Sequence, residues 1–309
     1  MYKWAGTVVL LFSVSWAAAQ GMPPEADTFL WKAQKSGRPT VYLLGTLHVG
    51  KVGAVLPTSF RRALKASRQL VVESDPDQLA LPQYAAQAAE LSAMMSDKRS
   101  LQQSLGEKRL AELNKMGAQS QDGLHFSARQ TIAPWVVWLT MQTLYTPKGY
   151  SARYGVDNLL MQSARQQGKP IIPMEQLQPL YTIRSIPEDK LLRSLDAQIR
   201  YQQALLQDER EMMADYQAGA AKKLWRQVSE PKYMLRYLPE QDKPFWQDMM
   251  LNRLLAERNQ AWMMQLVSVL PKQPTLVAVG SGHLFGEQGL VRKMRLIGYT
   301  VTPVMPSEN

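Results

Sequence analysis

Two histidines of this 309-residue chain follow the same local pattern, an apolar run that leads into Gly-x-x-His. The first run, VYLLGTLH, contains Gly45 and ends at His48; the second, LVAVGSGH, contains Gly280 and ends at His283. A glycine at the end of a strand lets the backbone turn sharply or approach a ligand closely. Parallel α/β sheets bind ligands at the carboxyl edge of their strands, so we expect both histidines on one rim.

Carboxylates follow two further apolar runs and complete a candidate metal centre. The run Gln69–Val72 leads to Glu73, and the run Pro170–Met174 leads to Glu175. Imidazole and carboxylate together suit a divalent ion such as Zn, Fe, Co or Mn. The chain has no cysteine, which excludes disulfides, thiol nucleophiles and cysteine-ligated metals, and its third histidine, His125, lies in no comparable pattern. A strand-end histidine is also commonly a hydrogen-bonded structural residue, and that alternative stays open for each of the two.

Arg258 lies in the middle of an apolar helical stripe. The spacing predicts a helix from Trp246 to Leu270 whose apolar positions are Leu251, Leu254, Leu255, Trp262, Leu266 and Val269. A permanently charged group cannot remain unpaired in an apolar interface. We therefore expect Arg258 to pair with a buried carboxylate or with an anionic ligand. Asp157, at the start of an expected helix, needs no role beyond offsetting the helix dipole.

The elements that must position these residues indicate an α/β fold. Short apolar runs predict strands over residues 28–33, 39–45, 69–73, 170–174, 275–280 and 299–304. Their continuous apolar composition favours a mostly parallel central sheet with flanking helices. Residues 77–241, rich in Leu, Met, Gln and Ala, predict a large helical insertion, or cap, between the two Gly-x-x-His strands. We expect residues 20–309 to form a single domain.

The first 19 residues have the pattern of a signal peptide. Lys3 supplies a positive start, an apolar stretch follows, and Ala17–Ala19 offers a cleavage site. No later segment is apolar over the roughly 18 residues that a transmembrane helix needs. We expect export to the periplasm and no stable membrane span once the signal is removed. An uncleaved N-terminal anchor is the alternative.

Basic residues are concentrated near the first histidine. The formal net charge is +10, and residues 28–72 hold eight Lys and Arg but no Asp or Glu. Because no nucleic-acid-binding module or interleaved aromatic pattern accompanies them, we expect no nucleic-acid partner. If the stretch flanks the site, it favours a peptide or small-molecule substrate that is anionic. The alternative is a solvated helix face away from the site. The sequence leaves the oligomeric state open.

In the order of its motifs the chain resembles the TraB/GumN family, which is related to the Tiki metalloproteases and more distantly to erythromycin esterase and ChaN-type proteins. The motifs are GTLH at 45–48, VVES at 71–74, YGVD at 154–157, GKPIIPME at 168–175, ERNQAW at 257–262 and VGSGHLFGEQGL at 279–290. The resemblance implies an α/β fold with a metal-dependent centre. Carried over by match, the metal ligands are His48, Glu73 and His283, the catalytic residues are Glu73, Arg258 and Asn259, and the glycines beside the bound ion are Gly45 and Gly280.

The function we expect is that of a periplasmic metal-dependent hydrolase, which acts on peptide bonds as the Tiki proteins do. In that mechanism Glu73 either completes the coordination or accepts the proton of a water that the metal acidifies. Arg258 stabilises the developing oxyanion or orients Glu73. Two alternatives remain open: a non-catalytic metal- or haem-binding protein, and an accessory protein of an envelope or polysaccharide pathway.

Overall fold

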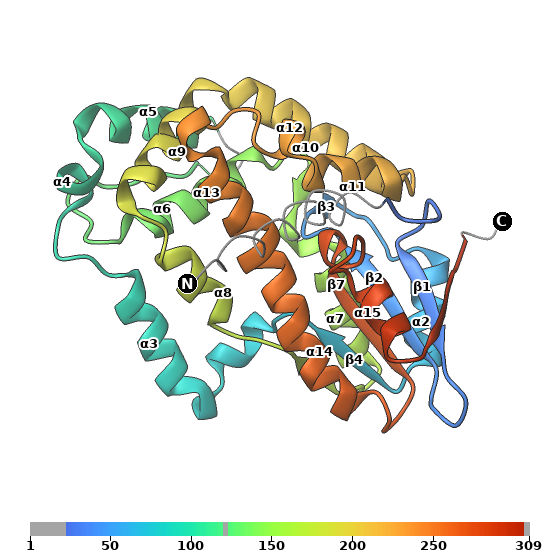
Figure 1. Ribbon diagram of the computed structural model, residues 1–309. Coiled ribbons are helices and arrows are strands. Elements are labelled where there is room, and N and C mark those ends of the chain that lie inside the picture. Colours follow the sequence, from blue (N-terminus) through green and yellow to red (C-terminus); the bar gives the residue numbers. More distant parts are fainter. Residues whose placement is uncertain (1–22, 120–122, 306–309) are drawn as a thin grey trace, which may run out of the picture.

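The computed structural model describes residues 23–119 and 123–305 and has a six-stranded sheet at its centre (Figure 1). The strand order is β6-β4-β7-β2-β1-β8, with β6, β4, β7 and β2 mutually parallel and β1 antiparallel to both of its neighbours. The strands are β1 (Leu30–Gln34), β2 (Val41–Thr46), β4 (Gln69–Val72), β6 (Ile171–Pro173), β7 (Thr275–Gly280) and β8 (Thr300–Pro303). The expected α/β class with a mostly parallel sheet is confirmed, and the expected signal peptide lies outside the described residues.

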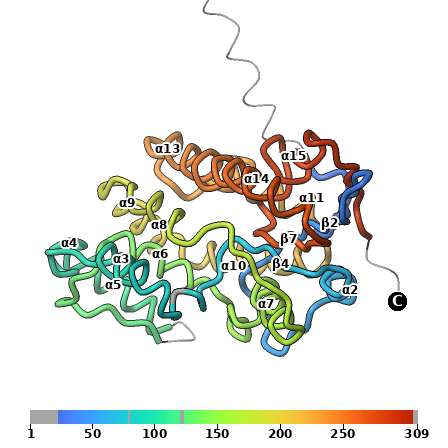
Figure 2. Tube along the Cα trace, turned by 90° about the horizontal axis from the view of Figure 1, so that it is seen from below, coloured from blue at the N-terminus to red at the C-terminus, as the bar shows by residue number. Residues whose placement is uncertain are grey.

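Helices cover both faces of the sheet, which explains why its central strands are buried along nearly their whole length. All four residues of β4 and the first five of β7 are buried. In Figure 2, α14 (Glu257–Val269) and α15 (Leu290–Leu296) lie on one face, whereas α7 (Val156–Gln166) and α2 (Thr58–Ala66) lie on the other. A strand buried on both faces gains by apolar residues at every position, not at alternate ones.

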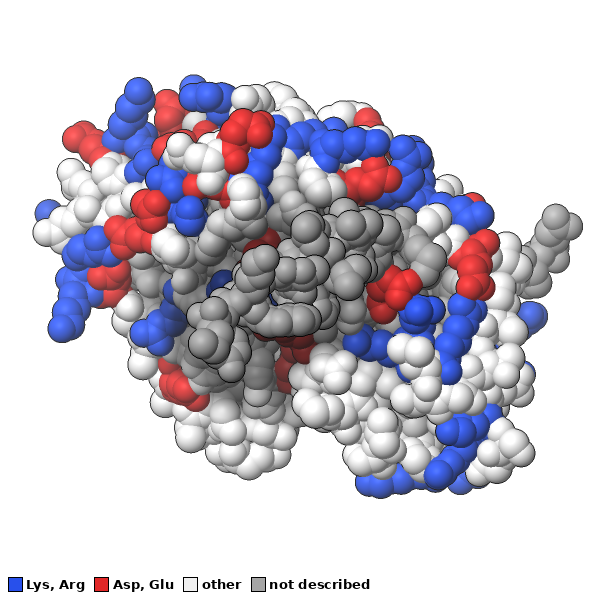
Figure 3. Space-filling model, viewed as in Figure 1, with Lys and Arg blue, Asp and Glu red and all other residues white. Residues whose placement is uncertain are grey.

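A helical region with its own apolar core extends from one end of the sheet. Its elements are α3 (Ala85–Met95), α4 (Leu101–Leu105), α5 (Glu107–Ala118), α6 (Pro134–Met141), α8 (Gln178–Arg184), α9 (Glu188–Arg200), the first half of α10 (Gln202–Gln217), α12 (Pro231–Met234) and α13 (Lys243–Gln247). The helix α11 (Ala221–Ser229) instead packs on the core of the sheet. The expected helical insertion is therefore present, although β6 and α7 return to the sheet within it. Figure 3 shows basic and acidic side chains interspersed over these helices. Within the described residues no helix is long and apolar enough to cross a membrane.

The helix expected over 246–270 is not regular. After α13 the chain forms a π-helical segment, η6 (Asp248–Ala256), and only then continues as α14. π-helical turns are uncommon and occur frequently at functional sites. They change the angle between successive residues, so a stripe counted at 3.6 residues per turn does not hold across them. Leu251 is buried, as that count predicts, but Leu254 and Leu255 are only half-buried.

Candidate functional site

The candidate site lies at the carboxyl edge of β4, β7 and β2, where Gly280 is the point that three side chains approach. Thr46 of β2 pairs with Gly280 of β7, and the last residue of β4 precedes Glu73. A Cβ atom on Gly280 would stand 3.2 Å from Glu73 Oε1, 3.6 Å from His48 Nε2 and 3.8 Å from His283 Cδ2. The fold thus brings together the three side chains that the motifs single out as metal ligands.

Gly45 occupies a different environment from Gly280. A Cβ atom on Gly45 would stand 3.0 Å from Leu284 Cδ1 and 3.1 Å from the Cα atom of Ser281. Its missing side chain therefore lets β2 pack closely against the turn η7 (Ser281–His283) that carries the second histidine. Of the two motif glycines, Gly280 is the one that borders the polar cluster.

Glu73 is held as a carboxylate by donors on both of its oxygens. The backbone N–H of Gly280 donates to Oε1 at 2.6 Å, and Nη2 of Arg258 donates to Oε2 at 2.6 Å. Burial on its own raises the pKa of Glu73, but the positive charges of His283 when protonated, Arg258 and His48, with the Gly280 N–H, lower it to about 2. Glu73 is therefore ionised at neutral pH, where Arg258 is its nearest permanent cation.

Arg258 also pairs with Glu175, whose role the sequence leaves open. Its Nε donates to both carboxylate oxygens, at 3.0 and 3.1 Å, and Trp262 Nε1 donates to the second oxygen at 3.0 Å. The side chains of Arg258 and Glu175 are 17% and 6% exposed, so this ion pair is largely desolvated. The guanidinium carbon lies 4.8 Å from the Trp262 ring centroid, within the range of a cation–π contact. The expectation that Arg258 pairs with a buried carboxylate is confirmed, and it pairs with two.

Asn259 fixes the orientation and the proton of His283. Its amide nitrogen donates to the backbone oxygens of His283 at 3.1 Å and Gln288 at 2.8 Å, so its Oδ1 must accept from His283 Nδ1, 2.7 Å away. Nε2 of the neutral ring is then an acceptor, and Nη1 of Arg258 donates to it at 3.1 Å. Burial, together with the charge of Arg258, lowers the pKa of His283 to about 4. His283 is consequently neutral at pH 7.

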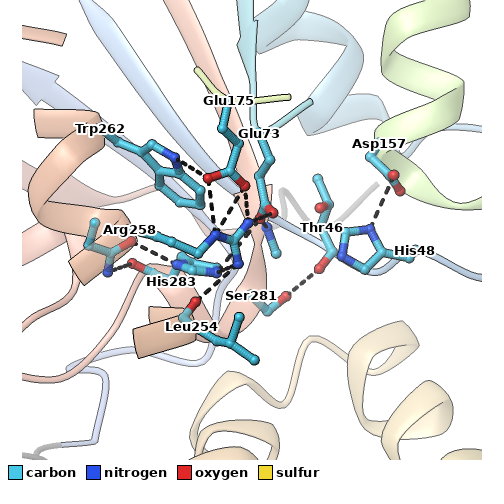
Figure 4. Close-up of polar contacts among 12 residues, drawn as sticks. Thr46, His48, Glu73, Asp157, Glu175, Leu254, Arg258, Trp262, Ser281 and His283 are labelled. Atoms are coloured by element: carbon cyan, nitrogen blue, oxygen red, sulfur yellow. Dashed lines mark hydrogen bonds and ion pairs between the residues drawn. The ribbon is translucent and has the colours of Figure 1, made fainter. Parts of the chain in front are cut away.

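Asp157 orients His48 in the same way from the opposite side of the site. His48 Nδ1 lies 3.2 Å from Asp157 Oδ2, and this carboxylate in the first turn of α7 raises the pKa of the imidazole. The His48 side chain is 64% exposed, in contrast to His283. A Cβ atom on Gly155 would lie only 2.3 Å from the His48 backbone oxygen, so that glycine lets the start of α7 approach the loop. Figure 4 shows Glu73 between the Arg258 cluster and His48.

Comparison with known proteins agrees with the motifs. The model of the TraB/PrgY/gumN family matches residues 29–303. This chain belongs to the TraB/PrgY/gumN family. It is 27% identical over 293 residues to the uncharacterized protein YbaP of Escherichia coli (strain K12), a match that covers 93% of this chain and 99% of that protein. The YbaP protein of Shigella flexneri matches with the same identity and coverage.

In this TraB/PrgY/gumN protein, the imidazole nitrogens of His48 and His283 and the carboxylate of Glu73 are atom types that divalent ions bind. Each histidine is held through Nδ1, by Asp157 or by Asn259, as metal-binding histidines are held by residues behind them. His283 Nε2 lies 3.9 Å from Glu73 Oε1. Within the described part of the chain, however, no three His, Cys, Asp or Glu side chains are grouped closely enough to hold an ion. The guanidinium on His283 Nε2 would have to withdraw for that nitrogen to bind a metal.

Proposed function

We propose that this protein is an exported metal-dependent hydrolase whose divalent ion is held by His48, His283 and Glu73. The observation that carries the proposal is the matched support of the two histidines. Each has its Nδ1 hydrogen-bonded to an oxygen, so each Nε2 is free of its own proton when the ring is neutral. Two histidines with only structural roles would not be expected to be held both through Nδ1 and both beside the same ionised carboxylate, Glu73.

The ion would supply a water of lowered pKa, near about 7, and would polarise the scissile carbonyl. Glu73 either completes the coordination of this ion or accepts a proton from the water, and the hydrogen bonds from Gly280 and Arg258 hold its carboxylate in place for either role. Arg258 is the residue that can stabilise an oxyanion. Arg258 Nη1 would have to move away from His283 Nε2 for that nitrogen to bind the ion. The hydrogen bond from Arg258 Nε to Glu175 would still hold the guanidinium in the site.

Peptide bonds are the substrate we favour, on the strength of the resemblance to the Tiki metalloproteases. The N-terminal signal pattern supports a periplasmic location, where the chain would meet peptides of the cell envelope or of the medium. The basic stretch over 28–72, which contains the GTLH motif, favours substrates with negative charge.

A non-catalytic metal- or haem-binding protein is the second candidate, and one observation favours it. Without an ion, neither Glu73 nor His283 has a pKa near neutral, since the values are about 2 and about 4. A general base works best when its pKa lies near the operating pH. The ligand cluster on its own is therefore better suited to binding a cation than to proton transfer.

The test is metal content and peptide hydrolysis measured on the same preparations. The purified protein is loaded in turn with Mn, Co, Zn and Fe, assayed against a peptide library, and assayed again after a chelator. His48→Ala should lose both the metal and the hydrolysis. The matched control is His125→Ala, because His125 is the third histidine, is exposed and lies outside the site.

The outcomes separate the two candidates. Hydrolysis that a chelator abolishes and the metal restores supports the hydrolase. Stoichiometric metal or a haem absorbance band without hydrolysis favours the binding protein. Hydrolysis that survives both the chelator and His48→Ala contradicts the metal-dependent reaction.

A further inference from the structure

A second cavity lies behind the loop that carries His48. Its volume is about 450 Å³, which is within the range of roughly 300–1,000 Å³ found for small-molecule pockets. The first turn of α2, the start of α7, the end of α10 and strand β3 (Gly50–Lys51) surround it. The wall is mainly apolar, with Leu47, Val55, Phe60, Val156, Leu159 and Met213 among its residues.

This cavity is separated from the candidate metal centre by backbone. Leu47 and Val156 line the cavity, whereas the residues that follow them, His48 and Asp157, face the polar cluster. The Val156 N–H donates to the Leu47 oxygen at 2.9 Å, so a hydrogen-bonded pair of backbone segments forms the partition. An occupant of the cavity would therefore touch the support of His48 without touching its ring.

The cavity is pre-formed on its inner side. Tyr216, which lines it, donates its hydroxyl to the Gly45 oxygen at 2.7 Å and stacks on Phe29 with ring centroids 4.4 Å apart. Both interactions hold the aromatic wall in place without an occupant. A rigid apolar wall lowers the ordering cost of binding an apolar group.

One cation lies at the rim of the cavity. Lys51 is the charged side chain among the lining residues, and it is exposed beside Val55, which is 77% exposed. Within the described ranges no carboxylate forms an ion pair with Lys51. The first turn of α2 has no side-chain cap on its N–H groups and contributes Ser59 to the wall. A lysine at the mouth of an apolar cavity is complementary to an anion that has an apolar tail.

We propose that this cavity binds a single-chain amphipathic anion of the fatty-acid class, with its chain against Phe60 and Leu159 and its carboxylate near Lys51. The proposal goes beyond the proposed function, because the occupant contacts none of the three candidate metal ligands. It can therefore fail or hold whether or not the protein is a hydrolase.

The test uses the environment-sensitive probe dansyl-undecanoic acid, followed by displacement with dodecanoate. We expect saturable binding at one probe per chain. Ala54→Trp, which places an indole inside the cavity wall, should weaken probe binding at least about tenfold. The matched control is Ala66→Trp, at an exposed position at the end of α2 that does not line the cavity.

The charge is tested separately with Lys51→Gln. This variant should weaken dodecanoate and leave dodecanol unchanged, whereas Lys272→Gln, an exposed lysine that does not line the cavity, should alter neither. Absence of saturable binding, or equal binding by the two tryptophan variants, overturns the proposal. Displacement by dodecanol as strong as by dodecanoate overturns the assignment of an anion, and displacement by an apolar peptide alone assigns the cavity to a different ligand class.

Discussion

Replacing Arg258 by methionine should destabilise the protein by about 3 to 5 kcal/mol, because it removes the cation shared by two buried carboxylates. The guanidinium pairs with Glu73 and Glu175, whose side chains are 16% and 6% exposed. Methionine keeps most of the apolar stem, so the loss reports the charge and its hydrogen bonds more than packing. Removing one partner leaves the other charges buried without compensation, which costs more than the intact pair contributes.

The magnitude can be worked from Glu73. Its pKa of about 2, against 4.5 for an ordinary glutamate, corresponds to roughly 3 kcal/mol of preference for the charged form in the folded protein. Arg258 is the one permanent cation among the groups that lower this pKa, so it supplies part of this preference at every pH, whereas His283 contributes only when it is protonated. After the substitution the Gly280 N–H still donates to Glu73 and the Trp262 N–H still donates to Glu175. The expected loss of stability is therefore toward the lower end of the range.

The assay is urea unfolding followed by tryptophan fluorescence, at about pH 7.5 and again at about pH 5. The control is Arg253→Met, because Arg253 pairs with Asp248 at the surface, where the side chains are 41% and 43% exposed; it should cost less than about 1 kcal/mol. In the wild type the stabilisation from Glu73 is present above a pH of 4.5 and is lost as the pH falls toward 2.

In the Arg258→Met variant Glu73 loses its nearest permanent cation, so its pKa rises and protonation at about pH 5 should recover part of the loss relative to wild type. A loss no larger than that of Arg253→Met refutes the reasoning. A loss that is the same at both pH values also refutes it, because it would show that packing and not charge was removed.

Three further predictions concern the histidines and the glycine between them. By NMR, His48 should titrate above 6.5, and Asp157→Asn should return it toward that value; the stability that the pair contributes is lost as the pH rises through the raised pKa. His48→Ala should change unfolding free energy by less than about 1 kcal/mol because the ring is exposed, whereas His283→Ala should cost about 2 to 3 kcal/mol because the ring is buried and hydrogen-bonded. Gly280→Ala should weaken metal binding at least about tenfold, since its methyl group would stand 3.2 Å from Glu73 Oε1.

Two controls make these comparisons specific. Gly282→Ala tests whether any alanine in the turn is harmful, because its Cβ would have only Leu255 and Val228 near it, each at 3.9 Å. His125→Ala tests whether any loss of imidazole changes metal binding. Equal effects of Gly280→Ala and Gly282→Ala would contradict the assignment of Gly280 as the meeting point of the ligands.

The strands could be predicted from the sequence because each is marked by local composition. The apolar runs at 69–73 and 275–280 became β4 and β7 with bounds that differ by at most one residue. The order of the strands could not be predicted, since β6 pairs with β4 across about a hundred residues of intervening chain. The π-helical segment η6 was not predicted, because counting apolar residues at 3.6 per turn does not show where the backbone hydrogen-bond pattern changes from α to π.

For the site, the sequence identified the strand-end residues and Arg258, and the resemblance added Asn259, but neither predicted that Asn259 supports His283 or that Asp157 supports His48. Asp157 lies in a helix start that has an ordinary explanation, and its contact with His48 depends on how α7 packs against the β2 loop. Glu175 follows an apolar run just as Glu73 does, and both pair with Arg258; they differ in that Glu175 accepts from Trp262 whereas Glu73 accepts from the Gly280 N–H. The sequence can predict that a carboxylate lies at the end of a strand. It cannot predict which side chains the fold places against that carboxylate, and these partners decide its role.

The net charge of the cluster indicates what kind of ligand these carboxylates favour. Glu73, Glu175 and Asp157 bring three negative charges to the cluster, against one permanent positive charge on Arg258. Protonation of His48 adds a second positive charge and still leaves the cluster one charge negative. A divalent ion that replaces the proton of His48 would make the cluster neutral, which is the electrostatic reason that a cation, and not an anion, suits the space in front of His48.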